Sequence, residues 1–227
     1  GESVYSEEAV GWIDGDFLQW TVDLESMPAS PEIDGIINDD EWEGAVLRDI
    51  SDVFGYDSPD TAGTVIAKIG FNDEANRIYI GVKYLTEGEI LERMGLGIYF
   101  DDDGNREWTW DRPGSEGNYW GYWVEGAPVM TFRSLSGPPY NSDPFYVFDN
   151  PELAFDVVDG HVEIEMAIPL GFHNTQEVAV YGPESIVGLA IFAMKRDDNE
   201  NPVFNAWWPQ NVLSIVTNPY QYAQVHI

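Results

Sequence analysis

Apolar and polar residues alternate over many short segments of this chain, and turn-forming residues separate the segments. Strict alternation over a short segment is typical of β-strands that bury one face. Asp159-Gly160 is a strong β-hairpin signal, and residues 72–76 form a second turn-rich loop. Because the helical period is almost absent, the pattern predicts an all-β protein, an antiparallel β-sandwich. The predicted strands are residues 64–71, 77–85, 96–100, 119–125, 129–134, 153–158, 161–168, 186–195 and 220–227.

The first thirty residues are expected to form an extension of this sandwich. Residues 17–22 alternate well enough for one strand, and the segment 27–31, which contains two prolines, is typical of a linker. We therefore predict an N-terminal strand extension over residues 1–30 and a single β-sandwich domain over residues 31–227. The extension strand is expected to pair either with its own sheet or with the sheet of a neighbouring copy.

The charge of the chain restricts its partners more than its length does. The 227 residues include ten Lys and Arg against 41 Asp and Glu, a net charge of −31. Such a surface repels phosphate backbones and anionic lipids, so we expect no nucleic-acid partner and no membrane-surface binding, whereas cations are attracted. There is no cysteine, which excludes disulfides and thiol nucleophiles. No apolar run is long enough for a spanning helix, so no membrane insertion is expected.

Clusters of acidic residues are candidate calcium sites. In the first cluster, side-chain oxygens occur at alternate positions around Gly104, a spacing that lets one loop wrap a hard cation. The loop lacks the EF-hand pattern, and an acidic turn is also typical of a merely solvated loop. The candidate Ca²⁺ ligands are Asp101, Asp103, Asn105 and Glu107 in the first loop, and Asp197, Asp198 and Asn199 in a second. A third acidic group comprises Asp34, Asp39 and Glu41.

Two aromatic groups are candidate sugar-binding sites. Trp and Tyr rings have an apolar face with a polar handle, which suits stacking on sugars, although each ring can equally fill a core position. Trp207 and Trp208 are adjacent and would face opposite sides of a strand, and Trp208 is the candidate for exposure. The candidate ligand-binding residues are Trp208, Gln210 and Asn211 in one group, and Trp120, Trp123 and Arg112 in the other.

Several short motifs also occur in a fixed order along the chain. They are Ile33-Asp34-Gly35 followed by Asp40-Glu41-Trp42, Phe71-Asn72-Asp73 leading into residues 77–82, a Glu-x-x-Ile-Pro pattern at residues 165–169, and Gly188-Leu189-Ala190-Ile191 with Arg196, Trp207, Pro209 and Asn218-Pro219 towards the end. Together they cover roughly residues 31–227, and their order and spacing resemble the family 9 carbohydrate-binding modules.

This resemblance implies a jelly-roll-like β-sandwich with structural Ca²⁺ and, in true binding modules, a pair of tryptophans that clamps a sugar. The same superfamily includes DOMON-like domains, some of which bind haem b through a Met plus a Lys or His. The residue types for such ligation are present, although both methionines are most simply core side chains. The residues concerned are Met166 and Met194, with Lys195, His161, His173 and His226.

The sequence therefore favours an exported, non-catalytic carbohydrate-binding β-sandwich with structural calcium, located outside a prokaryotic cell or on its surface. It contains no Ser/His/Asp order, phosphate loop or zinc-protease motif, so we do not expect an enzyme. The alternative is a self-assembling extracellular filament or surface-layer subunit, a homo-oligomer joined through residues 1–30 by β-strand complementation and calcium. A further alternative is a haem b-binding, DOMON-like electron-transfer domain.

Overall fold

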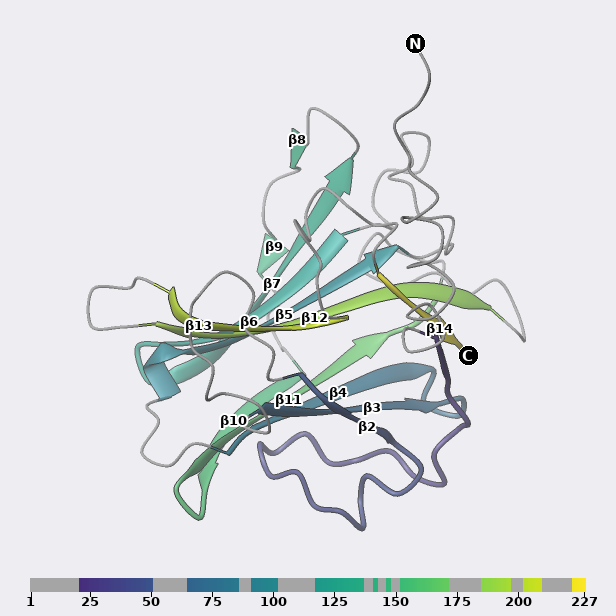
Figure 1. Cartoon of the computed structure of the whole chain (residues 1–227), viewed down its shortest axis with the longest axis horizontal. Helices are drawn as coiled ribbons and strands as arrows, with labels where there is room; N and C mark the ends of the chain where they lie inside the picture. Colours follow the sequence, from purple (N-terminus) through teal and green to yellow (C-terminus); the bar gives the residue numbers. More distant parts are fainter. Residues whose placement is uncertain are drawn as a thin grey trace, which may run out of the picture.

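In a computed structural model, the chain forms two β-sheets that face each other (Figure 1). The all-β prediction is confirmed, and the helical element among the described residues is the short 3₁₀ turn η2 (Leu91–Arg93). The structure describes residues 21–50, 65–85, 91–101, 117–136, 141–142, 146–147, 152–171, 185–196, 202–209 and 222–227.

The larger sheet, called the large sheet below, has nine strands in the order β1-β14-β12-β5-β6-β7-β8, with β13 also paired to β12 and β9 to β7. Its pairs are antiparallel except for β1 with β14, which is parallel. The strands are β1 (Thr21–Asp23), β5 (Met94–Asp101), β6 (Gly117–Val124), β7 (Ala127–Ser136), β8 (Asn141–Ser142), β9 (Tyr146–Val147), β12 (Ile186–Arg196), β13 (Pro202–Trp208) and β14 (Ala223–His226).

The smaller sheet, called the small sheet below, has five antiparallel strands in the order β10-β11-β4-β3-β2. They are β2 (Val46–Asp49), β3 (Val65–Asn72), β4 (Arg77–Tyr84), β10 (Leu153–Val158) and β11 (His161–Pro169). The main core lies between the sheets, where inward side chains of β4 and β11 meet those of β5, β6 and β12.

The strands predicted between residues 64 and 195 are confirmed as β3 to β7 and β10 to β12, whereas the pattern misses β2, β13 and the two-residue strands β8 and β9. Two hairpin turns have both central residues at positive φ, which is the geometry of type I′ turns. Asp159 and Gly160 have φ of 51° and 86°, as the Asp-Gly signal predicts. Glu125 and Gly126 have φ of 50° and 86°, so this turn begins one residue before the turn expected at residues 126–128.

Both sheets also bury much of their outer faces. The pattern of burial along β5 and β11 is nearly continuous rather than alternating. One outer cluster lies on the large sheet and contains Tyr99, Ala190, Phe192, Met194 and Tyr222 with Trp120 packed against them. A second lies on the small sheet and contains Met27, Ile37, Trp42, Tyr79 and Ala167 with Ile33 and Ala45.

The described part of the predicted N-terminal strand pairs within its own chain. Thr21 to Asp23 form β1, which runs parallel to the C-terminal strand β14, with Val22 opposite Val225. Residues 1–20 lie outside the described residues, so assembly through this extension stays a prediction. Among the described residues, no helix has the length and apolar character needed to cross a membrane.

Candidate functional site

The outer face of the large sheet gathers aromatic residues from three neighbouring strands. The register aligns Phe192 of β12 with Gly97 of β5, Gly97 with Trp120 of β6, and Trp120 with Thr131 of β7. Side chains of directly paired residues lie on the same face of a sheet. This row therefore places one aromatic ring on each side of a glycine.

Trp120 lies over that glycine. Three atoms of its indole ring are 3.2, 3.2 and 3.3 Å from the position that a Cβ on Gly97 would occupy. The ring meets Tyr99 and Phe192 edge-on, with ring centroids 6.1 and 5.2 Å apart and interplanar angles of 81° and 78°. Edge-to-face contacts of this kind are favourable, so the ring is held in one orientation while remaining only half-buried.

Polar groups lie beside this ring on the same face. Asn118, two residues before Trp120 on β6, is 2 % exposed and pairs with Tyr99 in the register. Its amide nitrogen Nδ2 is buried and donates no hydrogen bond within the part of the chain that the structure describes. Thr131 is also buried. Both side chains are covered in this structure, whereas part of the Trp120 ring is accessible to a ligand.

The structure brings few of the predicted sugar-binding residues together. Trp208 is 4 % exposed and belongs to the main core, because its partner in the register is Ile191, a core residue of β12. The expectation that Trp208 is exposed is therefore wrong. Trp123 packs against the core and contacts Phe155 with ring centroids 5.9 Å apart. It lies on the inner face of β6, opposite to Trp120, because side chains alternate along a strand.

The remaining predicted sugar-binding residues, Gln210, Asn211 and Arg112, lie outside the described residues. The aromatic neighbours of Trp120 were not singled out by the sequence. Tyr99 and Phe192 belong to predicted strands, and the signal that could have found them is that both have the opposite parity to the core residues Ile98 and Ile191.

The two acidic loops are attached at opposite ends of the large sheet. Asp101 ends β5 beside Gly188, whereas Lys195, just before the second loop, pairs with Met94 at the start of β5. Seven residues of extended strand separate these attachment points by roughly 23 Å. Asp101 itself is fully buried. The other candidate ligands, Asp103, Asn105, Glu107, Asp197, Asp198 and Asn199, lie outside the described residues, and calcium stays a prediction.

The third acidic group does not converge in the structure. Asp34 Oδ1 accepts the backbone N–H of Ile36, Asp39 binds Lys68 at 2.6 Å, and Glu41 accepts from Asn38. No group of three metal-ligating side chains occurs among the described residues.

The methionines considered for haem lie on different sides of a sheet. Met166 is fully buried in the core between the sheets, whereas Met194 lies in the outer cluster of the large sheet. The two methionines therefore lie in separate environments, and ligation of a haem by one Met with a Lys or His stays a prediction.

No protein-family profile matches the sequence, and no curated protein matches it. Solved structures with a similar fold include a family 9 carbohydrate-binding module from Caldicellulosiruptor kristjanssonii in complex with cellotriose, with a TM-score of 0.53 and 11 % identity over 91 % of this chain and 92 % of that chain. A structure of a family 9 module from the same organism in complex with glucose gives a TM-score of 0.52 and 12 % identity over 91 % of this chain and 94 % of that chain. The chain therefore has the β-sandwich fold of family 9 carbohydrate-binding modules, and the resemblance found in the sequence is confirmed at the level of the fold.

Proposed function

We propose that this protein is a non-catalytic, extracellular carbohydrate-binding module that stacks a sugar ring on Trp120, on the outer face of the large sheet. The observation that carries the proposal is the anchored, half-buried ring of Trp120 over Gly97. The fold shared with modules that were solved with cellotriose and glucose supports the same ligand class.

The arrangement around Trp120 suits sugar binding energetically. A ring that is already held by Tyr99 and Phe192 loses little conformational freedom when a ligand stacks on it. Asn118 and Thr131 beside it are buried, so a ligand hydroxyl reaches them only by displacing the side chains that cover them. Such a displacement would let a ligand oxygen accept from Asn118 Nδ2, which has no partner among the described residues.

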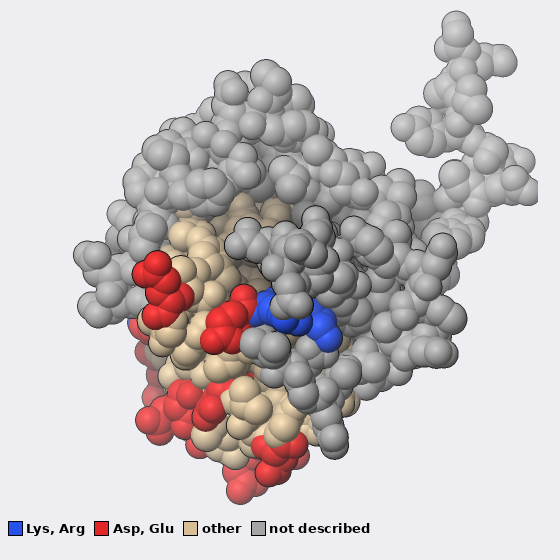
Figure 2. Space-filling view, turned by 90° about the vertical axis from the view of Figure 1, so that its left-hand side faces the viewer, with Lys and Arg blue, Asp and Glu red and all other residues tan. Residues whose placement is uncertain are grey.

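The charge of the protein narrows the ligand class to neutral glycans. In the view of Figure 2, acidic side chains are spread over the described surface, whereas Lys and Arg occupy a small area. With a net charge of −31, the protein repels uronic-acid and sulfated polysaccharides. We therefore propose a neutral polysaccharide as the partner, with Ca²⁺ bound in the loops that follow β5 and β12 as a brace at each end of the large sheet.

The experiment is calorimetric titration of the full chain with glucose, cellotriose, other neutral oligosaccharides and an oligogalacturonate. A neutral oligosaccharide should bind and the oligogalacturonate should not. Trp120→Ala should weaken binding by about tenfold or more, because it removes the stacking surface. Trp123→Phe, on the same strand but the inner face, is the matched control and should bind as the unchanged protein does.

Either of two results would overturn the proposal: no neutral oligosaccharide binds, or Trp120→Ala binds as tightly as the unchanged protein. Repeating the melting curves in Ca²⁺ and in EDTA tests the brace, since chelation should lower the melting temperature.

A further inference from the structure

The outer face of the small sheet is covered by residues 24–45, called the strap below, which connect β1 to β2 (Figure 1, purple). Trp42 and Ile37 of the strap lie over Gly81, with side-chain atoms 3.0 and 3.1 Å from the position of a Cβ on that glycine. Met27 of the strap occupies the equivalent place over Gly70. The strap is thus packed into gaps that the two glycines leave in the sheet.

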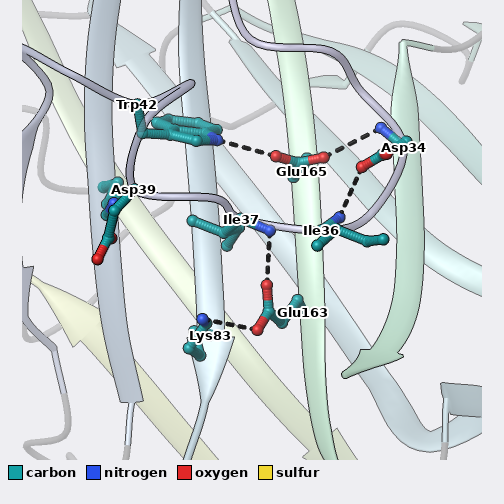
Figure 3. A network of polar contacts seen from close by, with 9 residues as sticks. Asp34, Ile36, Ile37, Asp39, Trp42, Lys83, Glu163 and Glu165 are labelled. Carbon is teal, nitrogen blue, oxygen red and sulfur yellow. Dashed lines mark hydrogen bonds and ion pairs between the residues drawn. The ribbon is translucent and has the colours of Figure 1, made fainter. Parts of the chain in front are cut away.

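Two buried glutamates of β11 hold the strap by its backbone (Figure 3). Glu165 Oε2 accepts the N–H groups of Asp34 and Gly35 at 3.1 and 2.8 Å, and its Oε1 accepts the indole N–H of Trp42 at 2.9 Å. Glu163 Oε2 accepts the N–H of Ile37 at 2.6 Å. Both side chains lie on the outer face of the small sheet and are almost completely buried.

Only one of these carboxyl groups has a cation beside it among the described residues. Lys83 of β4 forms an ion pair with Glu163 at 2.7 Å, and Lys68 of β3 is paired with Asp39 at 2.6 Å. Within the part of the chain that the structure describes, Glu165 accepts from N–H groups and forms no ion pair, and the carboxylate of Asp34 lies nearby. Among the described residues, the charged and titratable groups on this face include Asp34, Asp39 and Glu41 of the strap, Lys68 of β3, Tyr79 and Lys83 of β4, Asp156 of β10, and His161 and Glu163 of β11.

We propose that Glu165 is a proton-controlled latch: the strap is held tightly when this carboxyl group is neutral, and it loosens when the group ionises. A neutral carboxyl group keeps lone pairs for the N–H donors of Asp34, Gly35 and Trp42. Ionisation adds a buried charge that no cation among the described residues offsets in an ion pair, which favours a state in which the strap lifts and water reaches the carboxylate.

The pKa of Glu165 is shifted in the direction that this latch requires. Burial raises the pKa of Glu165 from 4.5 to about 7, against the opposing effect of the N–H donors of Gly35, Trp42 and Asp34. Because the pKa is higher in the closed state than in the open state, the closed state is fully favoured below pH 4.5. This advantage is lost progressively as the pH rises to about 7, and it stays absent above that value.

Hydrogen exchange measured by mass spectrometry on peptides from the strap of the full chain tests the latch, with rates corrected for the intrinsic effect of pH. The opening equilibrium of residues 33–42 should rise by up to about tenfold per pH unit between pH 4.5 and 7 and then level off. Peptides from β5 should show no such dependence, because that strand lies in the large sheet, on the other side of the core from Glu165.

Variants separate the latch from general stability. Glu165→Gln should abolish the pH dependence of strap exchange. Asp34→Asn, which keeps an oxygen for the N–H of Ile36, should shift the dependence to lower pH, and it keeps the test decisive if Glu165→Gln does not fold. Asp39→Asn, an exposed carboxylate of the same strap paired with Lys68, is the control and should leave the dependence unchanged. Strap exchange that is independent of pH in the unchanged protein, or equally dependent in Asp34→Asn and Glu165→Gln, would overturn the proposal.

Discussion

Large side chains lie over glycines on both outer faces of the sandwich, but one face is closed and the other leaves a tryptophan partly exposed. On each face a tryptophan and a methionine lie over glycines of the central strands, close to the positions that a Cβ on each glycine would occupy. The pairs are Trp42 over Gly81 and Met27 over Gly70 on the small sheet, and Trp120 over Gly97 and Met194 over Gly95 on the large sheet.

The difference lies in where the tryptophan comes from. Trp42 belongs to the strap, is 2 % exposed, and donates its indole N–H to Glu165, so the face beneath it is sealed. Trp120 belongs to the sheet itself and is only half-buried. A segment laid over a sheet closes the face, whereas a ring that rises from the sheet keeps part of its own surface for another molecule. On the proposed function, the first face serves stability and the second serves binding.

Replacing each tryptophan by alanine gives the largest expected effect. Trp42→Ala should lower the free energy of unfolding by about 3–5 kcal/mol, because it leaves a cavity and removes a donor from buried Glu165. Trp120→Ala should cost less, about 1–2 kcal/mol, since its ring is partly exposed before the change. Urea denaturation of both variants measures this, and equal losses would remove the distinction between a sealed and an open face.

The ion pair beneath the strap gives the next effect. Lys83→Met leaves the carboxylate of Glu163, whose side chain is 2 % exposed, with the N–H of Ile37 but without its cation. We expect a loss of about 3 kcal/mol in the free energy of unfolding, the low end for a broken buried pair, because the Lys83 side chain is 28 % exposed.

Lys68→Met is the matched control on the same face. Its partner Asp39 has a side chain that is 95 % exposed and can return to water, so the melting temperature should change little. If both lysine variants lose the same stability, burial beneath the strap is not what makes the Lys83 pair important.

The fold could be predicted from the sequence to the extent that it depends on local alternation. The Asp159-Gly160 turn and the strands on both sides of it follow from residues that are adjacent in the chain. β2 is missed because it is only four residues long, and β13 is missed because it begins with a proline and its pattern is irregular. β2 is defined by its pairing with β3, and β13 by its pairing with the longer strand β12.

The surroundings of Trp120 and of Glu163 depend on the register between strands and on which segments lie over each sheet. A local sequence pattern contains neither. Trp120 is visible in the sequence, but its contacts with Tyr99 and Phe192 require the alignment of three strands. Trp208 is misplaced because the parity of β13 relative to β12 decides which of two adjacent tryptophans enters the core. The alternation around Glu163 is typical of a strand with one solvated face, whereas the strap buries that face.

The smallest expected effect comes from adding one methyl group to each glycine. Gly81→Ala places a Cβ 3.0 Å from the ring of Trp42, which is buried beneath the strap and has no room to shift, so we expect a loss of about 1–2 kcal/mol in the free energy of unfolding.

Gly97→Ala places a Cβ 3.2 Å from Trp120, whose half-buried ring can tilt outward. The strain should then be offset by the lower flexibility of alanine in the unfolded chain, leaving stability nearly unchanged. The tilt should instead appear as a several-fold change in affinity for the neutral oligosaccharide bound by the unchanged protein, measured by calorimetry. A Gly97→Ala variant that loses stability but binds normally would show that Trp120 is as structural as Trp42.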